Sequence, residues 1–146
     1  MNASEKLIRD IVAQVLQQTT GTCADGFVKK VDPSGILMVQ TSTVKCEPFE
    51  QKGVSLKDVA TLEEAPRMGC GVMELEPNTS FEWTLTYDEW DYVIDGQLDI
   101  EIDGRIVRGN KGDLILIPKG SHIHFQSTPG TRYVYFVYPA NWSSQD

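Results

Sequence analysis

Four carboxylates and one tyrosine lie within residues 82–91 of this 146-residue chain, and these side chains could do chemistry. The carboxylates are Glu82, Asp88, Glu89 and Asp91, and the tyrosine is Tyr87. Burying like charges together costs free energy, so such a cluster usually lies at a solvent-filled opening of the fold or around a cation. Carboxylate oxygens are the ligands that a hard cation such as Mg²⁺ prefers. The cluster predicts an acidic functional site. The alternative is that these carboxylates have only a structural role.

Residues 2–18, at the N-terminus, predict a short amphipathic helix. Their apolar side chains recur at positions 7, 8, 11, 12, 15 and 16, which is the spacing of a narrow helical stripe. Asn2 or Ser4 can cap its start, and Gly21 suits its end. Such a stripe can pack on the rest of its own chain, pack on a second copy of the protein, or dock on a partner protein. Residues 19–26 are small and polar and predict a linker.

From Phe27 onward the hydrophobic period changes to two, which predicts β-strands. Segments such as GQLDIEID alternate apolar and acidic side chains, and the segments are bounded by turn-forming residues. Asp103-Gly104 is a hairpin signal. Residues 53–67 are the exception and could hold a helical turn. Many short strands without interleaved helices predict an all-β sandwich or barrel.

The balance of charges excludes some partners. Thirteen basic and 21 acidic residues give a net charge of -8, which argues against nucleic acid and against anionic membrane surfaces. No apolar run is long enough to span a membrane, and the first residues lack the pattern of a secretory signal. The cysteines Cys23, Cys46 and Cys70 are odd in number and lack zinc-site spacing. A reduced, cytoplasmic protein is the prediction that follows.

Two local motifs resemble the conserved motifs of the cupin superfamily. Glu89 is followed after six residues by Gly96, and Gly112 is followed by Pro118 and Gly120. The resemblance implies an all-β fold, a cupin double-stranded β-helix or jelly-roll barrel, preceded here by the short amphipathic helix. Glycines suit the corners of a small barrel, and a proline suits the end of a buried strand. We therefore predict two parts, the N-terminal helix in residues 1–20 and a cupin domain in residues 21–146.

Metal-binding cupins hold their metal with three histidines and a glutamate, and this chain keeps only the glutamate, Glu89. The three histidine positions are here Glu82, Thr84 and Ile123. The chain's two histidines, His122 and His124, flank the third position, and strand alternation points them to the opposite face. We expect no transition metal, because such metals favour imidazole. Glu82 and Glu89 could hold Mg²⁺ instead.

Longer blocks resemble one cupin family, the ethanolamine-utilisation proteins EutQ. The blocks are FEWTLTYDE at residues 81–89, IPKGS at residues 117–121 and YPANW at residues 138–142, with Arg132 before the last. The resemblance covers residues 68–143. It implies a role in a cytoplasmic bacterial microcompartment that degrades ethanolamine. It also implies an acetate kinase activity, which interconverts acetyl phosphate and ADP with acetate and ATP.

If the protein is a kinase, residues in and near these blocks have roles in catalysis and binding. Phosphoryl transfer needs positive charge, magnesium and in-line positioning. The catalytic candidates are Glu82, Tyr87, Asp88, Glu89, Lys119 and Arg132. The candidates for binding substrate or cofactor, which would be Mg²⁺ with ATP or ADP, are Thr84, Asp91 and Tyr92. The chain has no glycine-rich phosphate loop. Lys119 could equally be a solvated lysine, and Arg132 could form a structural ion pair.

Three functions remain open at this point. The first is the kinase. The second is a non-catalytic assembly module, in which residues 2–18 tether the protein to microcompartment shell or cargo proteins. The third is a metal-free cupin isomerase or small-ligand binder, which is less favoured because neither histidine points into the barrel. We also expect a homodimer, because Phe81, Trp83 and Leu85 would be exposed strand positions that need cover.

Overall fold

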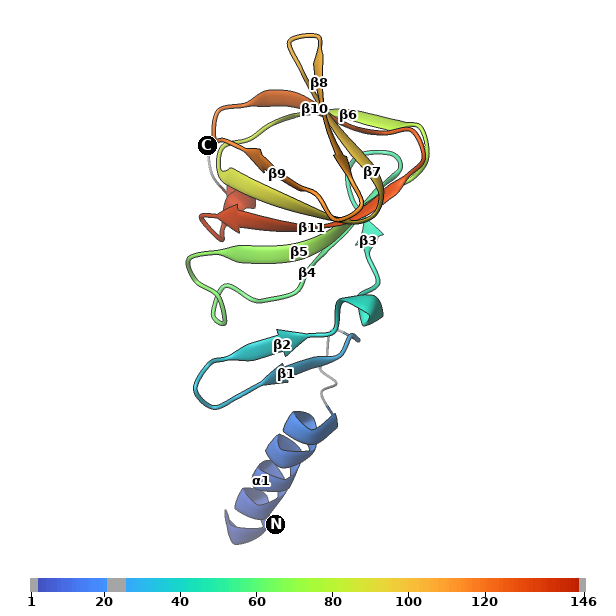
Figure 1. Ribbon diagram of the computed structural model, residues 1–146. Helices are drawn as coiled ribbons and strands as arrows, with labels where there is room; N and C mark the ends of the chain where they lie inside the picture. Colours follow the sequence, from blue (N-terminus) through green and yellow to red (C-terminus); the bar gives the residue numbers. More distant parts are fainter. Residues whose placement is uncertain (1–2, 21–25, 145–146) are drawn as a thin grey trace. The chain divides into compact units, whose positions relative to one another are not determined.

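The computed structural model describes residues 3–20 and 26–144 (Figure 1). The chain divides into two compact units, Met1–Lys45 and Cys46–Asp146. The first unit contains the predicted helix as α1 (Ala3–Thr20), the antiparallel pair β1 (Lys29–Val31) and β2 (Leu37–Val39), and the short helix η1 (Thr41–Thr43). Residues 21–25 of the predicted linker, with Cys23, lie outside the described residues. No helix in the described ranges is long and apolar enough to cross a membrane.

The described part of the second unit contains nine strands, which curl into the predicted all-β jelly-roll barrel (Figure 1). The strands are β3 (Glu47–Pro48), β4 (Val54–Asp58), β5 (Gly69–Leu75), β6 (Thr79–Thr84), β7 (Asp88–Ile102), β8 (Arg105–Asn110), β9 (Leu114–Ile117), β10 (His122–Ser127) and β11 (Thr131–Tyr138). The short helix η2 (Trp142–Ser144) follows. The strand order is β3-β4-β5-β11-β7-β10-β6, and β8 and β9 also pair with β7.

Strand β7 joins the two halves of the barrel. Its first half pairs with β9 and β11, and its second half pairs with β8 and β10. Gly96 lies at the change of partner with a φ of 76°, and a Cβ there would collide with the carbonyl oxygen of Gly130. The glycine that ends the first cupin-like motif is therefore required by the bend of the strand.

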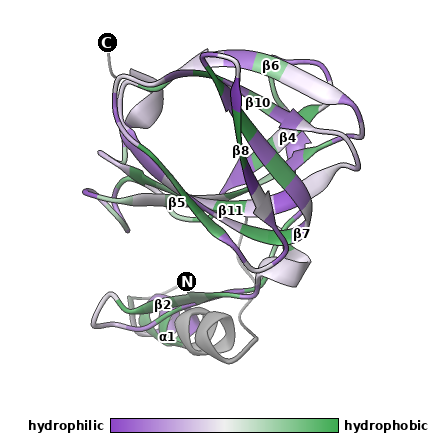
Figure 2. Ribbon diagram, turned by 45° about the horizontal axis from the view of Figure 1, so that its top comes forward, coloured by the Kyte–Doolittle hydropathy of each residue, from purple (hydrophilic) through white to green (hydrophobic). Residues whose placement is uncertain are grey.

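The turn from β7 to β8 confirms the predicted hairpin signal. Asp103 and Gly104 have φ values of 50° and 77°, so both central residues are left-handed, as a type I′ turn requires. Hydrophobic and hydrophilic residues alternate along the end of β7 before this turn (Figure 2). Residues 53–67 contain β4 and then a single helical turn, in which the Ala65 N–H donates to the carbonyl oxygen of Thr61 at 2.9 Å.

The expectation that Phe81, Trp83 and Leu85 are exposed is wrong. Phe81 and Leu85 belong to the hydrophobic core, and half-buried Trp83 packs against it. In β6 and the residues after it, the odd-numbered side chains point into the barrel, because successive side chains of a strand alternate between its faces. These three residues therefore give no reason to expect a dimer.

Candidate functional site

A small pocket lies inside the barrel. Aromatic rings and apolar chains line it, together with one carboxyl group, that of Glu89. The lining residues are Phe49, Leu56, Met73, Phe81, Trp83, Tyr87, Glu89, Phe125, Tyr135, Val137 and Trp142. The centre of a water molecule can occupy about 20 Å³ of it, which is room for about one water molecule. Only a small group can therefore enter the pocket as it stands.

Strand β7 places Glu89 and Asp91 on the inner face of the barrel. Their neighbours Trp90 and Tyr92 point outward and are 46% and 41% exposed, whereas Asp91 is fully buried and Glu89 is 4% exposed. Apart from an interaction between the two carboxyl groups, Glu89 Oε1 and both oxygens of Asp91 have no described hydrogen-bond partner. Buried polar atoms are nearly always paired, so these three oxygens indicate a site that receives a ligand or a proton.

Burial makes both carboxyl groups hard to ionise. It raises the pKa of Glu89 to about 7, an effect that hydrogen bonding to Asp91 and to Tyr87 partly offsets. Burial also raises the pKa of Asp91 well above its usual range, and the neighbouring charge of Glu89 raises it further. Because like charges in a shared dry site repel, the pair holds at least one proton near neutral pH.

Two tyrosines of the pocket wall are held by hydrogen bonds. The Tyr87 hydroxyl accepts from Trp83 Nε1 at 2.9 Å. The Tyr135 hydroxyl donates to Asp58 Oδ1 at 2.5 Å. Gly71 lies in register between Tyr135 and Asp58, and a Cβ at Gly71 would overlap the Tyr135 ring. No sequence motif indicated this contact, because it depends on three strands that are distant in the chain.

The structure brings together only some of the residues that the sequence proposed. Tyr87, Glu89 and Asp91 are buried on the inner face of the barrel. Glu82 and Thr84 are exposed on the outer face, where His122 contacts Glu82 Oε1 through Nε2 and Thr84 Oγ1 through Nδ1, both at 2.5 Å. Because successive side chains of a strand alternate between its faces, Thr84 lies on the opposite face from the buried Leu85 next to it.

The remaining candidates also lie outside the pocket. Asp88 is exposed and accepts from the backbone N–H of Lys119 at 2.8 Å, and the side chain of Lys119 is exposed. Arg132 pairs with Glu74 on the neighbouring strand β5. Tyr92 faces outward. The structure therefore does not bring either proposed cation to the buried carboxyl pair.

The proposed magnesium site is not formed by Glu82 and Glu89, because these residues lie on opposite faces of the barrel wall. Glu89 and Asp91 offer oxygen atoms of the type that Mg²⁺ prefers. However, Mg²⁺ usually keeps several of its water ligands, and the pocket has room for about one water. The pocket residues thus do not fit hydrated magnesium.

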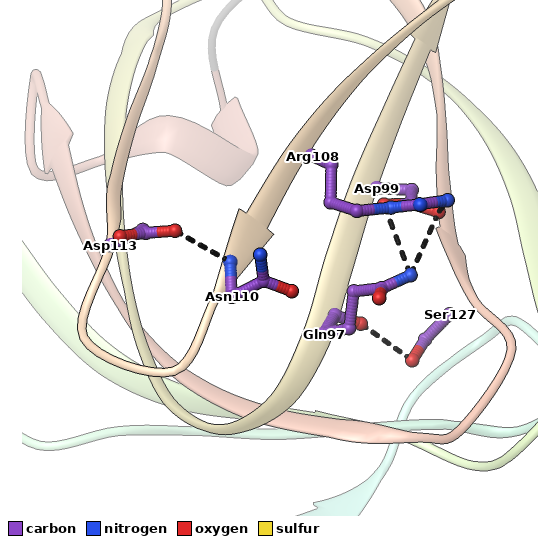
Figure 3. Close-up of polar contacts among 6 residues, drawn as sticks. All are labelled: Gln97, Asp99, Arg108, Asn110, Asp113 and Ser127. Carbon is purple, nitrogen blue, oxygen red and sulfur yellow. Dashed lines mark hydrogen bonds and ion pairs between the residues drawn. The ribbon is translucent and has the colours of Figure 1, made fainter.

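A third buried carboxyl group on β7, that of Asp99, shows the usual arrangement for comparison. Asp99 is 5% exposed and accepts from Arg108 Nε at 2.9 Å and from a second guanidinium nitrogen at 3.1 Å. Figure 3 shows the Gln97 amide directed at the same carboxylate, and Ser127 bonded to the Gln97 carbonyl. Asp99 is thus a paired structural group, and the unpaired state of Glu89 and Asp91 is not a general property of this barrel.

Comparison with known proteins finds close similarity over nearly the whole chain. The model of the family "Ethanolamine utilisation protein EutQ" matches residues 2–144. A protein of Clostridioides difficile named acetate kinase EutQ is 46% identical, over 99% of this chain and 95% of its own length. A Salmonella typhimurium protein of the same name is 33% identical over 97% of this chain. The chain spans 64% of the length of that relative.

Solved structures agree with these matches. The structure of the Clostridium difficile EutQ protein has a TM-score of 0.79 and 49% identity, and the match covers 83% of this chain and 93% of that one. The cupin domain of a transcriptional regulator from Enterobacter cloacae has a TM-score of 0.52 and 16% identity, over 60% of this chain and 97% of that one. The second likeness shows the fold alone, which is a cupin barrel.

Proposed function

The chain belongs to the EutQ family of ethanolamine-utilisation proteins, and from this premise we propose that it is an acetate kinase-type phosphotransferase. The reaction interconverts acetyl phosphate and ADP with acetate and ATP. The relatives that carry the name acetate kinase support this proposal. The structural observation that carries it is buried Glu89, which has an unpartnered oxygen and lines a pocket that admits only a small group.

Glu89 can bind the acetyl end of the substrate as a neutral acid. The pair of Glu89 and Asp91 holds a proton near neutral pH, because burial raises the pKa of both groups. A buried neutral carboxyl group can donate a hydrogen bond to an oxygen of the substrate. The aromatic wall of the pocket would contact the methyl group. Glu89 would then hold the acyl oxygen while the phosphoryl group remains outside the pocket.

The nucleotide has to bind outside the pocket. The pocket is too small for it, and no Lys or Arg is among the described lining residues. The proposed cation Arg132 is held by Glu74, whereas the exposed Lys119 forms no described ion pair. Lys119 is therefore the better candidate for a contact with the phosphates. Magnesium, which the reaction class requires, would enter with the nucleotide.

Synthesis of ATP from acetyl phosphate and ADP, with Mg²⁺ present, tests the proposal. Glu89→Met removes the hydrogen-bond donor and keeps the approximate volume. We expect it to lower kcat/KM for acetyl phosphate by about 2- to 12-fold, because one hydrogen bond between neutral groups contributes about 0.5–1.5 kcal/mol. Glu89→Gln keeps an amide donor and should retain more activity. Glu82→Gln, on the outer face, is the control and should match the wild type.

Two results would count against this proposal. If the purified wild-type protein forms no ATP above a blank lacking protein, the kinase activity is rejected. If Glu89→Met keeps the wild-type kcat/KM, the reaction does not use the pocket.

A role as an assembly module is the second candidate, and one observation favours it. Three apolar side chains of α1 are accessible: Leu7, Ile8 and Ile11 are 61%, 60% and 50% exposed. The helix belongs to a compact unit separate from the barrel. An exposed apolar helix stripe can dock into a groove of a shell or cargo protein. This role needs no catalysis, and both functions can be present in one chain.

A further inference from the structure

The pocket inside the barrel combines two features that together favour positive charge. Seven aromatic residues line it, which are Phe49, Phe81, Trp83, Tyr87, Phe125, Tyr135 and Trp142. Neighbouring rings contact one another with centroids 5.1–6.5 Å apart, as for Phe81 and Phe125 or Trp83 and Trp142. The faces of aromatic rings carry negative potential and attract cations.

The second feature is the carboxyl pair. Glu89 lines the pocket and is buried, and apart from the interaction between the two carboxyl groups, Glu89 Oε1 and both oxygens of Asp91 have no described hydrogen-bond partner. The described lining residues include no Lys, Arg or His that could neutralise the pair. A buried carboxylate without a cation is unstable, so a cation that enters the pocket gains both the charge interaction and a hydrogen bond.

The size of the pocket restricts which cation fits. A hydrated metal ion needs several waters that the pocket has no room for. An ammonium group is about as large as a water molecule and can donate its N–H groups to a carboxylate. Because the ammonium group fills the space of about one water molecule, the attached carbons would lie outside that space, against the rings of Trp83, Tyr87 and Trp142 that line the pocket.

We infer that the barrel pocket binds the ammonium group of a small primary alkylammonium ion, with the nitrogen at Glu89 and the carbons against the rings of Trp83, Tyr87 and Trp142. This ligand is opposite in charge to the acyl substrate of the proposed kinase. The inference does not rest on the kinase activity. If both are correct, alkylammonium binds when the carboxyl pair is ionised and competes with the acyl group for the same space.

Equilibrium binding of ethylammonium tests the inference without any turnover. The probe is ethylammonium chloride, titrated at pH 8 against the full chain and followed by calorimetry and by tryptophan fluorescence. Sodium chloride keeps the ionic strength constant. Ethanol serves as the neutral ligand of similar shape. We expect saturable binding of ethylammonium and none of ethanol, together with a rise in Tm at saturating ethylammonium.

Two variants locate the binding. Glu89→Gln removes the charge and keeps the shape, and we expect it to weaken ethylammonium binding at least 10-fold. Glu63→Gln removes an exposed glutamate outside the pocket lining and should change binding less than 2-fold. The Trp83 indole N–H signal in an NMR spectrum should shift on binding in the wild type, because its ring lines the pocket. Unlike the kinase proposal, which predicts that Glu89→Gln retains more activity than Glu89→Met, this inference predicts that Glu89→Gln loses the ligand.

Three outcomes would overturn the inference. The first is an absence of saturable ethylammonium binding to the wild type. The second is equal binding to wild type and Glu89→Gln, which would place the ligand elsewhere. The third is saturable binding of acetate at pH 8 without binding of ethylammonium, which would show that the pocket takes anions.

Discussion

Glu89 and Asp91 are the residues at which this barrel departs from ordinary burial of polar groups. Asp99 on the same strand is buried to a similar extent, but Arg108 and Gln97 satisfy it. Removing a carboxylate from water costs several kcal/mol when nothing pairs with it. In this protein the carboxyl pair lies at a pocket, where a substrate or ligand can bind to it. We therefore place the function at this pocket.

The stability of the fold should depend on pH through Glu89. Burial raises its pKa from 4.5 to about 7. Between these values the folded state holds a proton that the unfolded state has lost, so stability falls as the pH rises through this window. At about 1.4 kcal/mol per pKa unit, the loss is about 3 kcal/mol. Glu89→Gln should therefore be more stable than the wild type at pH 8 and similar to it at pH 4.5.

Urea unfolding at a series of pH values measures this difference. Glu82→Gln, on the outer face, controls for the loss of any glutamate. A difference between wild type and Glu89→Gln that stays constant from pH 4.5 to pH 8 would contradict the prediction.

At the scale of elements, α1 and β7 present their apolar side chains in different ways. The inward face of β7 packs Val93, Leu98 and Ile100 into the core. By contrast, Leu7, Ile8 and Ile11 on α1 stay largely exposed. An isolated helix of this length gains little stability in water, so burying its stripe on a partner would stabilise it. The periodicity predicted the helix, but it could not say what covers the stripe.

Replacement of the exposed stripe tests the proposed tether. The variant carries Leu7→Glu, Ile8→Glu and Ile11→Glu. Because an apolar groove would have to accept charged groups, we expect at least a 10-fold loss of co-sedimentation with purified microcompartment shells. ATP synthesis should be unchanged, since the barrel is untouched. The control variant is Lys6→Ala with Arg9→Ala on the same helix, and it should sediment with the shells. Retention of the triple-Glu variant by the shells would exclude this stripe as the tether.

At the scale of the whole molecule, the outer face of the barrel suggests a different basis for the expected homodimer. Large side chains lie exposed on three adjacent strands, β9, β7 and β11. Leu116, Trp90 and Phe136 are in register across them and are 47%, 46% and 36% exposed. Contiguous exposed apolar patches commonly mark contacts between proteins. We propose this face as the dimer contact, in place of Phe81, Trp83 and Leu85.

Sedimentation of the purified protein tests the dimer. The wild type should sediment as a dimer at micromolar concentration. Trp90→Glu should shift it to the monomer, because a charge would be buried in an apolar contact. Ile106→Glu is a matched control on β8, since Ile106 is 48% exposed, and it should leave the dimer intact. A monomeric wild type, or a dimer that Trp90→Glu does not affect, would exclude this face.

The sequence by itself determined the elements, the family and part of the site. Period two in the strands and the turn at Asp103-Gly104 depend on local chemistry, and the structure agrees with both. Tertiary structure decided which face of each strand is inside. Glu82 and Glu89 are seven positions apart and both acidic, yet only Glu89 is buried, because the barrel closes over one face of each strand. Likewise, the contact of Tyr135 with Asp58 exists only because non-consecutive strands meet across Gly71, and no local pattern encodes such a meeting.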